Sequence, residues 1–266
     1  VVPKPVQKPH PPMWMGCSRR ESILRAARAG LGALVFGFVE PEQAAQWVEE
    51  YYDILKSEEC VPIGHVVNPN IAAVTAMSVH DNEDEAIRRG LDGFRFFGYS
   101  LAHYAVFGEH KPGRTDIWAD FEEVRDKMPD NAGRGGIGTV AQVQDHMQAY
   151  ADVGMDQMIF VQQHGKNRHE HICESLELFA KEVQPAFKEK EAERQANKDA
   201  ELAPYIEAAL ARRPGMAELA DEGIPVVKSA GRRMQDDGRV YAEGGTYADP
   251  TRGGGIPVPR QDPRAS

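Results

Sequence analysis

The chain has 266 residues, of which 41% are hydrophobic and 27% are charged, and its formal net charge is −10. This composition is typical of a soluble globular protein with one sizeable domain. The acidic balance argues against nucleic-acid binding, and no stretch approaches the roughly 18 consecutive apolar residues of a membrane span. The three cysteines, Cys17, Cys60 and Cys173, fit no metal or disulfide pattern and indicate reduced thiols in a cytoplasmic protein.

The first predicted unit is a strand followed by a helix. Met13–Cys17 is a short apolar run after two prolines, which favours an extended strand. Ser18 and Glu21 have the spacing of a capping box, so we expect a helix over Arg19–Ala29. Gly30 supplies the left-handed residue that ends this helix.

The same order of strand and helix returns twice in the next fifty residues. Leu31–Phe38 is almost continuously apolar and predicts a second strand, after which Glu40-Pro41 opens a second helix. Ile71–Val79 predicts a third strand by its content of Val, Ile and Thr. The acidic run Glu83–Glu85 then suits the start of a helix.

The last predicted unit is the clearest. Thr139 begins a helix with a capping box, and Gly154 ends it. Met158–Val161 predicts a fourth strand. An amphipathic helix over Ile172–Val183 follows, and we expect Pro185 to halt it.

Apolar strands that alternate with helices predict an α/β fold whose parallel strands are buried on both faces. Such a sheet is either open and doubly wound or closed as a (β/α)8 barrel, and about four strands do not close a barrel. The expected domains are residues 1–187, the strand and helix part, and residues 188–266. The second part comprises a charged, solvent-facing helix over Lys188–Leu210 and a largely extended or disordered tail, with the alternative that the tail wraps a partner subunit.

Three segments together resemble luciferase-like flavin-dependent monooxygenases: Lys8–Ser18, Gly136–Thr139 with the helix and strand after it, and Ser175–Pro185. Their order and rough spacing match that family from Val1 to about Lys188. The resemblance implies the C-terminal portion of a (β/α)8 TIM barrel with an extended C-terminal tail. The family's first four strands would precede Val1, so the chain is expected to be a piece of a longer protein or a processed one.

The resemblance also implies an activity. In this family, reduced FMN lies at the carboxyl ends of the barrel strands, where barrel enzymes work, and O2 is used to oxidise an organic substrate. A small-molecule substrate and a flavin reductase are then the expected partners. Deazaflavin-dependent oxidoreductases share the fold, so the choice between FMN and deazaflavin stays open.

The expected cofactor-binding residues are Gly16, Cys17, Ser18 and Arg19, which lie where the first strand meets the first helix. In the family a serine in this turn contacts the FMN phosphate, and Ser18 matches its position. A helix start favours an anion because its backbone N–H groups are free. The alternatives are that Ser18 only caps the helix and that Arg19 is only solvated.

The expected substrate pocket comprises Phe36, Phe38, His80 and His164, which follow predicted strands. The phenylalanines can wall a flavin or a substrate, or simply pack in the barrel core. Each histidine can shuttle protons at the barrel mouth, or be an ordinary polar surface residue. No metal site is expected, because the spacing within His169–His171 does not suit tetrahedral ligands.

Three functions therefore remain open. The first is an FMN-dependent monooxygenase, or a fragment of one that is inactive alone, whose catalytic residues would lie in the N-terminal half. The second is a non-catalytic barrel fragment or subunit that needs an N-terminal half or forms a homo-oligomer. The third is an unrelated (β/α) protein with a ligand at the Ser18 helix start.

Overall fold

The computed structural model describes residues 4–36, 39–128, 135–215, 220–223, 246–248 and 255–257. The chain divides into two compact units, Val1–Pro214 and Gly215–Ser266. The second unit contains a 3-10 turn, η4 (Asp221–Gly223), and an antiparallel pair, β6 (Thr246–Ala248) with β7 (Gly255–Pro257). Among the helices that the structure describes, none has the length and hydropathy needed to cross a membrane.

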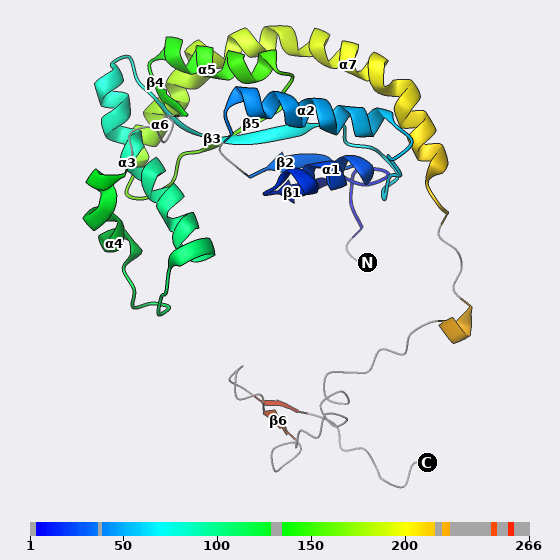
Figure 1. Cartoon of the computed structure of the whole chain (residues 1–266), viewed down its shortest axis with the longest axis horizontal. Coiled ribbons are helices and arrows are strands. Elements are labelled where there is room, and N and C mark those ends of the chain that lie inside the picture. The colour runs from blue at the N-terminus through cyan, green and yellow to red at the C-terminus, as the bar shows by residue number, and fades with distance from the viewer. Residues whose placement is uncertain are drawn as a thin grey trace. The chain divides into compact units, whose positions relative to one another are not determined.

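The first unit is built on parallel strands (Figure 1). In chain order they are β1 (Trp14–Cys17), β2 (Gly32–Val35), β3 (Ile71–Val79), β4 (Gly136–Gly138) and β5 (Gln157–Val161). β1 pairs with β2, and β2 pairs with the start of β3. β3 then has two further neighbours, since Ala72–Ala76 pairs with β5 and Met77–Val79 pairs with β4.

This arrangement confirms the predicted fold class, a parallel α/β fold that forms part of a barrel. Within the described residues, β1 and β5 each have a single strand neighbour, so the sheet is not closed. The glycines of Gly136–Gly138 predict a turn and a helix cap, and the structure has the strand β4 there instead. It has three residues, two of them glycines, and is too short for a periodicity to show.

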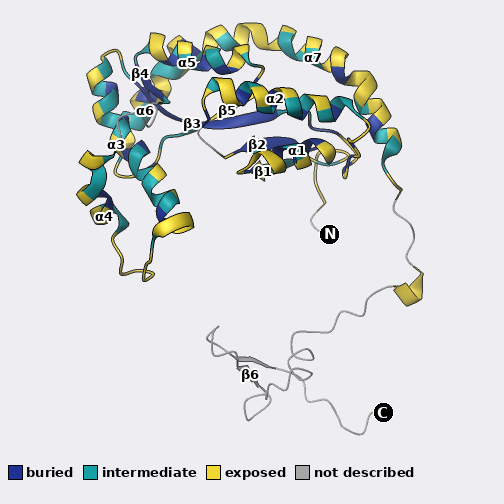
Figure 2. Ribbon diagram, viewed as in Figure 1, coloured by how far each residue is buried: buried dark blue, intermediate teal, exposed yellow. Residues whose placement is uncertain are grey.

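Helices cover the outer face of the sheet, and Figure 2 shows their exposed sides around the buried β3. The α-helices are α1 (Arg20–Arg28), α2 (Pro41–Lys56), α3 (Glu83–Ala102), α4 (Ile117–Val124), α5 (Val140–Asp152), α6 (His169–Leu178) and α7 (Gln184–Arg212). The π-helical turns are η1 (His103–Phe107) and η3 (Phe179–Val183), and η2 (Arg125–Lys127) is a 3-10 turn.

The main core lies between α1, α2 and the first three strands. The sequence also predicts one apolar face for the helix after Glu40-Pro41, formed by Ala44, Trp47, Val48, Tyr51 and Leu55. The structure confirms this face in α2, where Trp47 is half-buried and the other four residues are buried. The Tyr51 hydroxyl lies 2.9 and 3.1 Å from the carbonyl oxygens of Leu31 and Asn68, which share its single proton. Because a buried hydroxyl without partners is costly, these bonds fix α2 against the segments that lead into β2 and β3.

The predicted capping pair of Ser18 and Glu21 is wrong. α1 begins at Arg20, and its N-cap is Arg19, whose N–H donates to the Ser22 hydroxyl at 3.2 Å. That hydroxyl in turn donates to the Arg19 carbonyl at 2.6 Å. The helix therefore begins one residue later than expected, and Ser18 is left outside its cap. Its end is as predicted, with Gly30 at φ 66°.

The prediction that Pro185 halts the last helix is also wrong. α6 passes into the π-helical turn η3, and α7 then begins at Gln184 with Pro185 in its first turn. Proline is tolerated there because a first-turn N–H has no partner inside the helix. The helical path therefore continues to Arg212 with a change of hydrogen-bond spacing at η3.

The segment Lys188–Leu210 is not the purely solvent-facing helix that its composition suggests. It belongs to α7, in which Leu202 and Ala209 are buried. The Arg212 guanidinium at its end donates to the carbonyls of Ser57 and Cys60, at 2.9 and 3.1 Å. The first compact unit ends at Pro214, so this helix belongs to it.

A buried carboxylate joins α7 to the amino ends of the strands. The Asp156 side chain, just before β5, is 1% exposed and accepts from Arg194 and Lys198 of α7, at 2.9 and 2.8 Å. It also accepts from the Tyr52 hydroxyl at 2.6 Å and from the Ile71 N–H at 2.9 Å. Burial and the neighbouring carboxylate raise the pKa of Tyr52, so its hydroxyl stays a donor.

Candidate functional site

The carboxyl ends of β1 and β2 lie side by side. Cys17 is paired with Val35, and the N–H of Phe36 donates to the Cys17 carbonyl at 2.8 Å. Since both strands run parallel, the turn after β1 and the segment after β2 emerge at the same edge of the sheet. The structure thus brings Phe36 next to the residues expected to bind the cofactor.

The residues of this turn point in different directions, because side chains alternate along a strand. Cys17 is fully buried in the core beneath the helices, and its thiol donates to the Met15 carbonyl at 3.2 Å. Burial raises the pKa of the Cys17 thiol, which therefore stays neutral. A cofactor can meet the backbone of Cys17 at this edge, whereas its side chain faces the core.

Gly16 and the start of α1 form an open surface. A Cβ atom at Gly16 would have no heavy atom within 4 Å, and both Ser18 and Arg19 are exposed. The N–H groups of Arg20 and Glu21 belong to the first turn of α1, where no carbonyl of the helix can accept them. These features suit a phosphate: free backbone donors, a hydroxyl, a cation and no obstructing side chain.

Arg19 is the cation available for such an anion. The neighbouring Arg20 makes a two-pronged ion pair with Glu50 of α2, at 2.7 and 2.8 Å, which holds its guanidinium against α2. The pairing raises the pKa of Arg20 and lowers that of Glu50. Arg19, which the sequence predicts as a ligand, is exposed, whereas Arg20 is held by Glu50.

Beside this turn, aromatic side chains from three parts of the chain form a cluster. Phe36 is 45% exposed, and its ring is 6.1 Å from that of Phe97 on α3. Phe97 lies 6.2 Å from the ring of His164, which follows β5, and His164 lies 6.2 Å from Phe94. The cluster supplies an apolar wall near the strand ends, with Phe36 as its exposed member.

His164 is a buried part of this wall, not an exposed surface histidine. It is 5% exposed, and its Nδ1 lies 3.3 Å from the amide nitrogen of Asn167. Its Nε2 is buried and has no hydrogen-bond partner among the described residues. Burial lowers the pKa of His164, so the ring is neutral near pH 7. We expect it to shape the site rather than exchange protons with solvent.

His80 plays a local part. Its Nδ1 accepts from the N–H of Asn82 at 3.0 Å, and Asn82 is the N-cap of α3. The ring thus supports the start of a helix, and among the described residues no ring of the aromatic cluster lies against it. Phe38 lies outside the described residues. In the described part of the chain, no three side chains of His, Cys, Asp or Glu gather in a way that could hold a metal ion.

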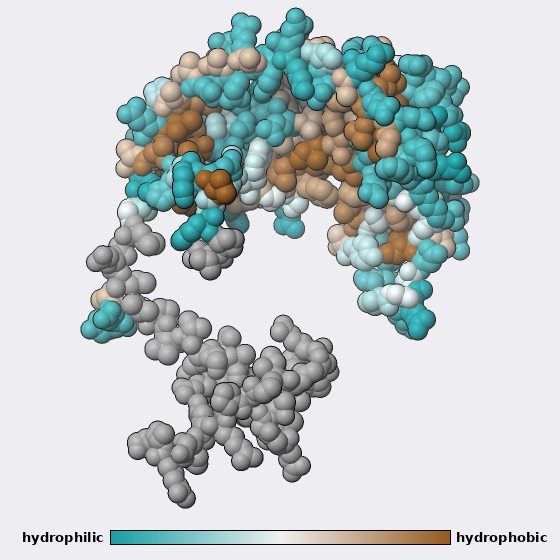
Figure 3. Space-filling view, turned by 180° about the vertical axis from the view of Figure 1, so that it is seen from behind, coloured by the Kyte–Doolittle hydropathy of each residue, from teal (hydrophilic) through white to brown (hydrophobic). Residues whose placement is uncertain are grey.

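The face of β5 that carries Ile159 is partly exposed. Ile159 is 36% exposed and is paired with Val74 of β3, whereas every residue of β3 is buried. Figure 3 shows hydrophobic residues reaching the surface on the hollowed side of the first unit. A closed barrel would bury such a strand residue, so the exposure of Ile159 fits the open sheet.

Phe97 and Gly93 of α3 were not singled out from the sequence. A Cβ atom at Gly93 would lie 2.3 Å from Asn167 Oδ1 and 2.6 Å from His164 Nδ1, so glycine allows the loop after β5 to approach the helix. The sequence feature that could have indicated this close approach is a pair of glycines three residues apart, Gly90 and Gly93. They mark a helix face that packs closely against a neighbour.

Comparisons with known proteins identify the family of this chain. The family model described as luciferase-like monooxygenase matches residues 1–157. Monooxygenase RslO1 from Streptomyces bottropensis superposes with a TM-score of 0.50 at 20% identity, over 70% of this chain and 51% of its own. Apo-MsnO8 gives a TM-score of 0.48 at 18% identity, over 68% of this chain and 53% of that one. A coenzyme F420 dependent tetrahydromethanopterin reductase from Methanopyrus kandleri gives 0.45 at 16% identity, over 66% and 51%.

A search of the curated proteins found no significant match. The chain spans about half the length of the solved structures that it matches. The family match extends from the first residue through β1 to β4 and reaches the first residue of β5. It covers more than half of the 266 residues, and the chain belongs to the luciferase-like monooxygenase family.

Proposed function

We propose that this chain supplies the phosphate-binding part of a reduced-FMN site in a monooxygenase that oxidises a small organic substrate with O2. One observation carries the proposal: an exposed helix start, with Ser18 and Arg19, follows a glycine that leaves open space at the end of β1. Reduced FMN, when bound, supplies the electrons that allow O2 to oxygenate the substrate. A flavin reductase is the partner that such an enzyme requires.

The roles of the residues follow from their positions. The Ser18 hydroxyl donates a hydrogen bond to the phosphate, and Arg19 adds a positive charge. The first N–H groups of α1 complete the anion site. Gly16 leaves room for the cofactor to approach the backbone of β1. Phe36 presents its exposed ring as an apolar wall and keeps water from one side of the bound molecule.

The test is a titration of FMN and of riboflavin, which lacks the phosphate, into the purified chain, followed by flavin fluorescence. Ser18→Ala removes one hydrogen bond to a charged group, worth about 1.5–3 kcal/mol, so the Kd for FMN should rise by about tenfold or more. The Kd for riboflavin should stay unchanged. Arg25→Gln, at an exposed position in the last turn of α1, is the matched control. A parallel titration with a deazaflavin distinguishes the two cofactor classes.

Gly16→Val provides a second arm of the test. The side chain enters open space, so the melting temperature should change little, while the affinity for FMN and for riboflavin should both fall. Equal binding of FMN and riboflavin by the unchanged chain would contradict the phosphate role. Unaltered FMN binding by Ser18→Ala would contradict it as well.

The open sheet favours a second candidate, in which this chain is a barrel fragment that needs an N-terminal half or a second copy. β1 and β5 have one strand neighbour each within the described residues, and unpaired strand edges recruit other strands. If so, the chain alone should bind no FMN up to high micromolar concentrations and should self-associate. A monodisperse monomer by light scattering, with a cooperative thermal transition, would exclude the self-associating form.

A further inference from the structure

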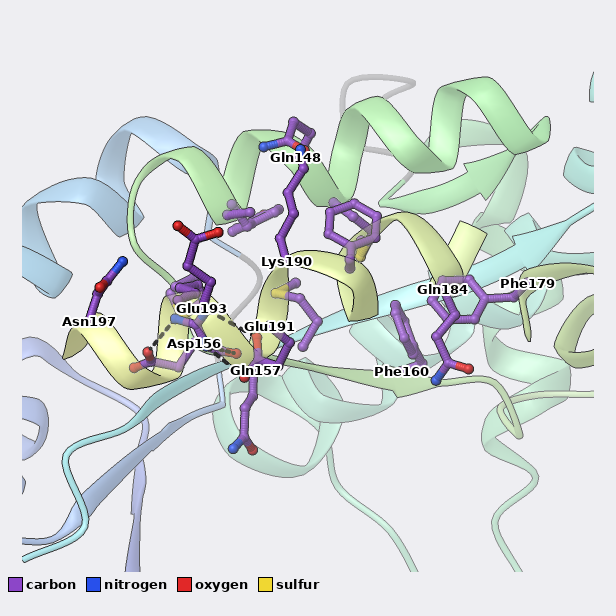
Figure 4. Close-up of a pocket in the computed structure, with 17 residues that line it drawn as sticks. Gln148, Asp156, Gln157, Phe160, Phe179, Gln184, Lys190, Glu191, Glu193 and Asn197 are labelled. Carbon is purple, nitrogen blue, oxygen red and sulfur yellow. Dashed lines mark hydrogen bonds and ion pairs between the residues drawn. The ribbon is translucent and has the colours of Figure 1, made fainter. Parts of the chain in front are cut away.

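A cavity of about 640 Å³ lies on the helix-covered side of the sheet, between α5 and the first half of α7 (Figure 4). We call it the α5–α7 groove, and its principal lining residues are Met147, Met158, Phe160, Phe179, Phe187 and Lys190. The residues at the amino end of β5, Asp156 and Gln157, also line it. The groove is therefore distinct from the turn after β1, where the phosphate site is proposed.

The floor of the groove is apolar and adaptable. Met158 and Phe160 come from β5, and Met147 comes from the buried face of α5. Phe160 and Phe179 meet edge to face, with ring centroids 4.9 Å apart. A volume of several hundred Å³ accommodates a small organic molecule, and methionine and phenylalanine side chains adjust to different shapes.

Some of the charged side chains around the groove are in ion pairs, and others are not. Arg194 is held by Asp156 and Glu191, at 2.9 and 3.0 Å. Lys190 has no hydrogen bond or ion pair to any other described residue, and in Figure 4 its side chain extends across the groove toward α5. Glu193, one turn further along α7, makes that end of the groove unfavourable for a second negative charge.

We propose that the α5–α7 groove binds an amphipathic monocarboxylate. Its carboxylate pairs with Lys190, and its apolar body lies on Met158, Phe160 and Phe187. A single negative charge pairs with Lys190, and the apolar body covers a floor that is otherwise open to water. Because the groove is separate from the turn after β1, such binding is independent of FMN.

The first experiment is a titration of dodecanoate, below its micelle concentration, into the 266-residue chain labelled at the methionine methyl groups. We expect saturable NMR shifts of Met147, Met155 and Met158, which line the groove. Met13 and Met15, at β1, report on the rest of the sheet and should not move. Shifts at the β1 methionines alone, or no shifts at all, would overturn the proposal.

Variants then separate the contributions of shape and charge. Ala151→Phe, at an exposed position of α5 that lines the groove, fills it without disturbing the core and should abolish the shifts. Lys190→Gln should weaken dodecanoate binding about threefold to fivefold, the effect of an exposed ion pair. Lys188→Gln on the same helix is the control and should leave the Kd unchanged. Equal binding of dodecyltrimethylammonium, or an unchanged Kd in Lys190→Gln, would refute the charge assignment.

Discussion

Removal of the buried carboxylate before β5 should destabilise the protein strongly. The Asp156 side chain is 1% exposed and accepts from two cations, one hydroxyl and one backbone N–H. Asp156→Ala leaves Lys198, whose side chain is 12% exposed, without its anion. Loss of one partner of a buried ion pair costs about 3–5 kcal/mol, because the remaining charge is uncompensated. That is a large part of the roughly 5–15 kcal/mol by which a domain of ordinary stability is folded.

The assay is equilibrium urea unfolding followed by tryptophan fluorescence, since Trp47 packs against the main core. Glu191→Gln is the control, because it removes an exposed partner of Arg194 and should cost less than about 1 kcal/mol. Hydrogen exchange should show faster exchange of α7 amides in Asp156→Ala before the sheet is affected. If Asp156→Ala and Glu191→Gln cost the same, the carboxylate is not what fixes α7 to the strands.

Two further predictions concern histidines and α3. Burial lowers the pKa of His146 and His164 below the ordinary value near 6.5, so below that pH the unfolded chain binds protons that the folded chain excludes. Stability should be full above pH 6.5 and fall toward pH 5, by up to about 1.4 kcal/mol per pH unit for each histidine, and the urea midpoint of His164→Gln should depend less steeply on pH. On α3, Gly93→Ala would place a methyl group 2.3 Å from Asn167 Oδ1 and should cost about 1–3 kcal/mol. Gly98→Ala meets no atom within 4 Å and should stabilise the helix by about 0.5–1 kcal/mol, and thermal unfolding of the two variants tests the difference in sign.

The fold was predictable where local periodicity is strong. β3 was predicted with the bounds that it has, and the buried face of α2 was predicted correctly, because each pattern extends over several residues. β4 has no such pattern, since its three residues depend on pairing with the end of β3. α7 was misjudged for a similar reason. Its composition is that of a solvated helix, whereas its attachment depends on ion pairs with Asp156, a residue far away in the chain.

The candidate site was predictable only in part, for reasons of the same kind. The turn after β1 is local, so the sequence indicated an anion site at Ser18 even though the cap itself is made by Ser22. The state of His164 depends on Phe94 and Phe97 of α3, and only the folded chain brings these rings together. The orientation of the Cys17 thiol was equally hidden, because it follows from the strand register with β2.

The two ends of the sheet differ in how far their side chains are paired. At the amino ends, the buried Asp156 carboxylate is paired with Arg194, Lys198 and the half-buried Tyr52, which makes this end a fixed support. At the carboxyl ends, Gly16, Ser18 and Arg19 are exposed and free of such pairing. Barrel enzymes keep their active sites at this second end, where loops can vary without loss of the core. Substitutions at Asp156 should therefore change stability far more than the affinity for FMN, whereas Ser18→Ala should do the reverse. We therefore expect the stability of the sheet to depend on the pairs around Asp156 at the amino ends, and not on the residues of the proposed site.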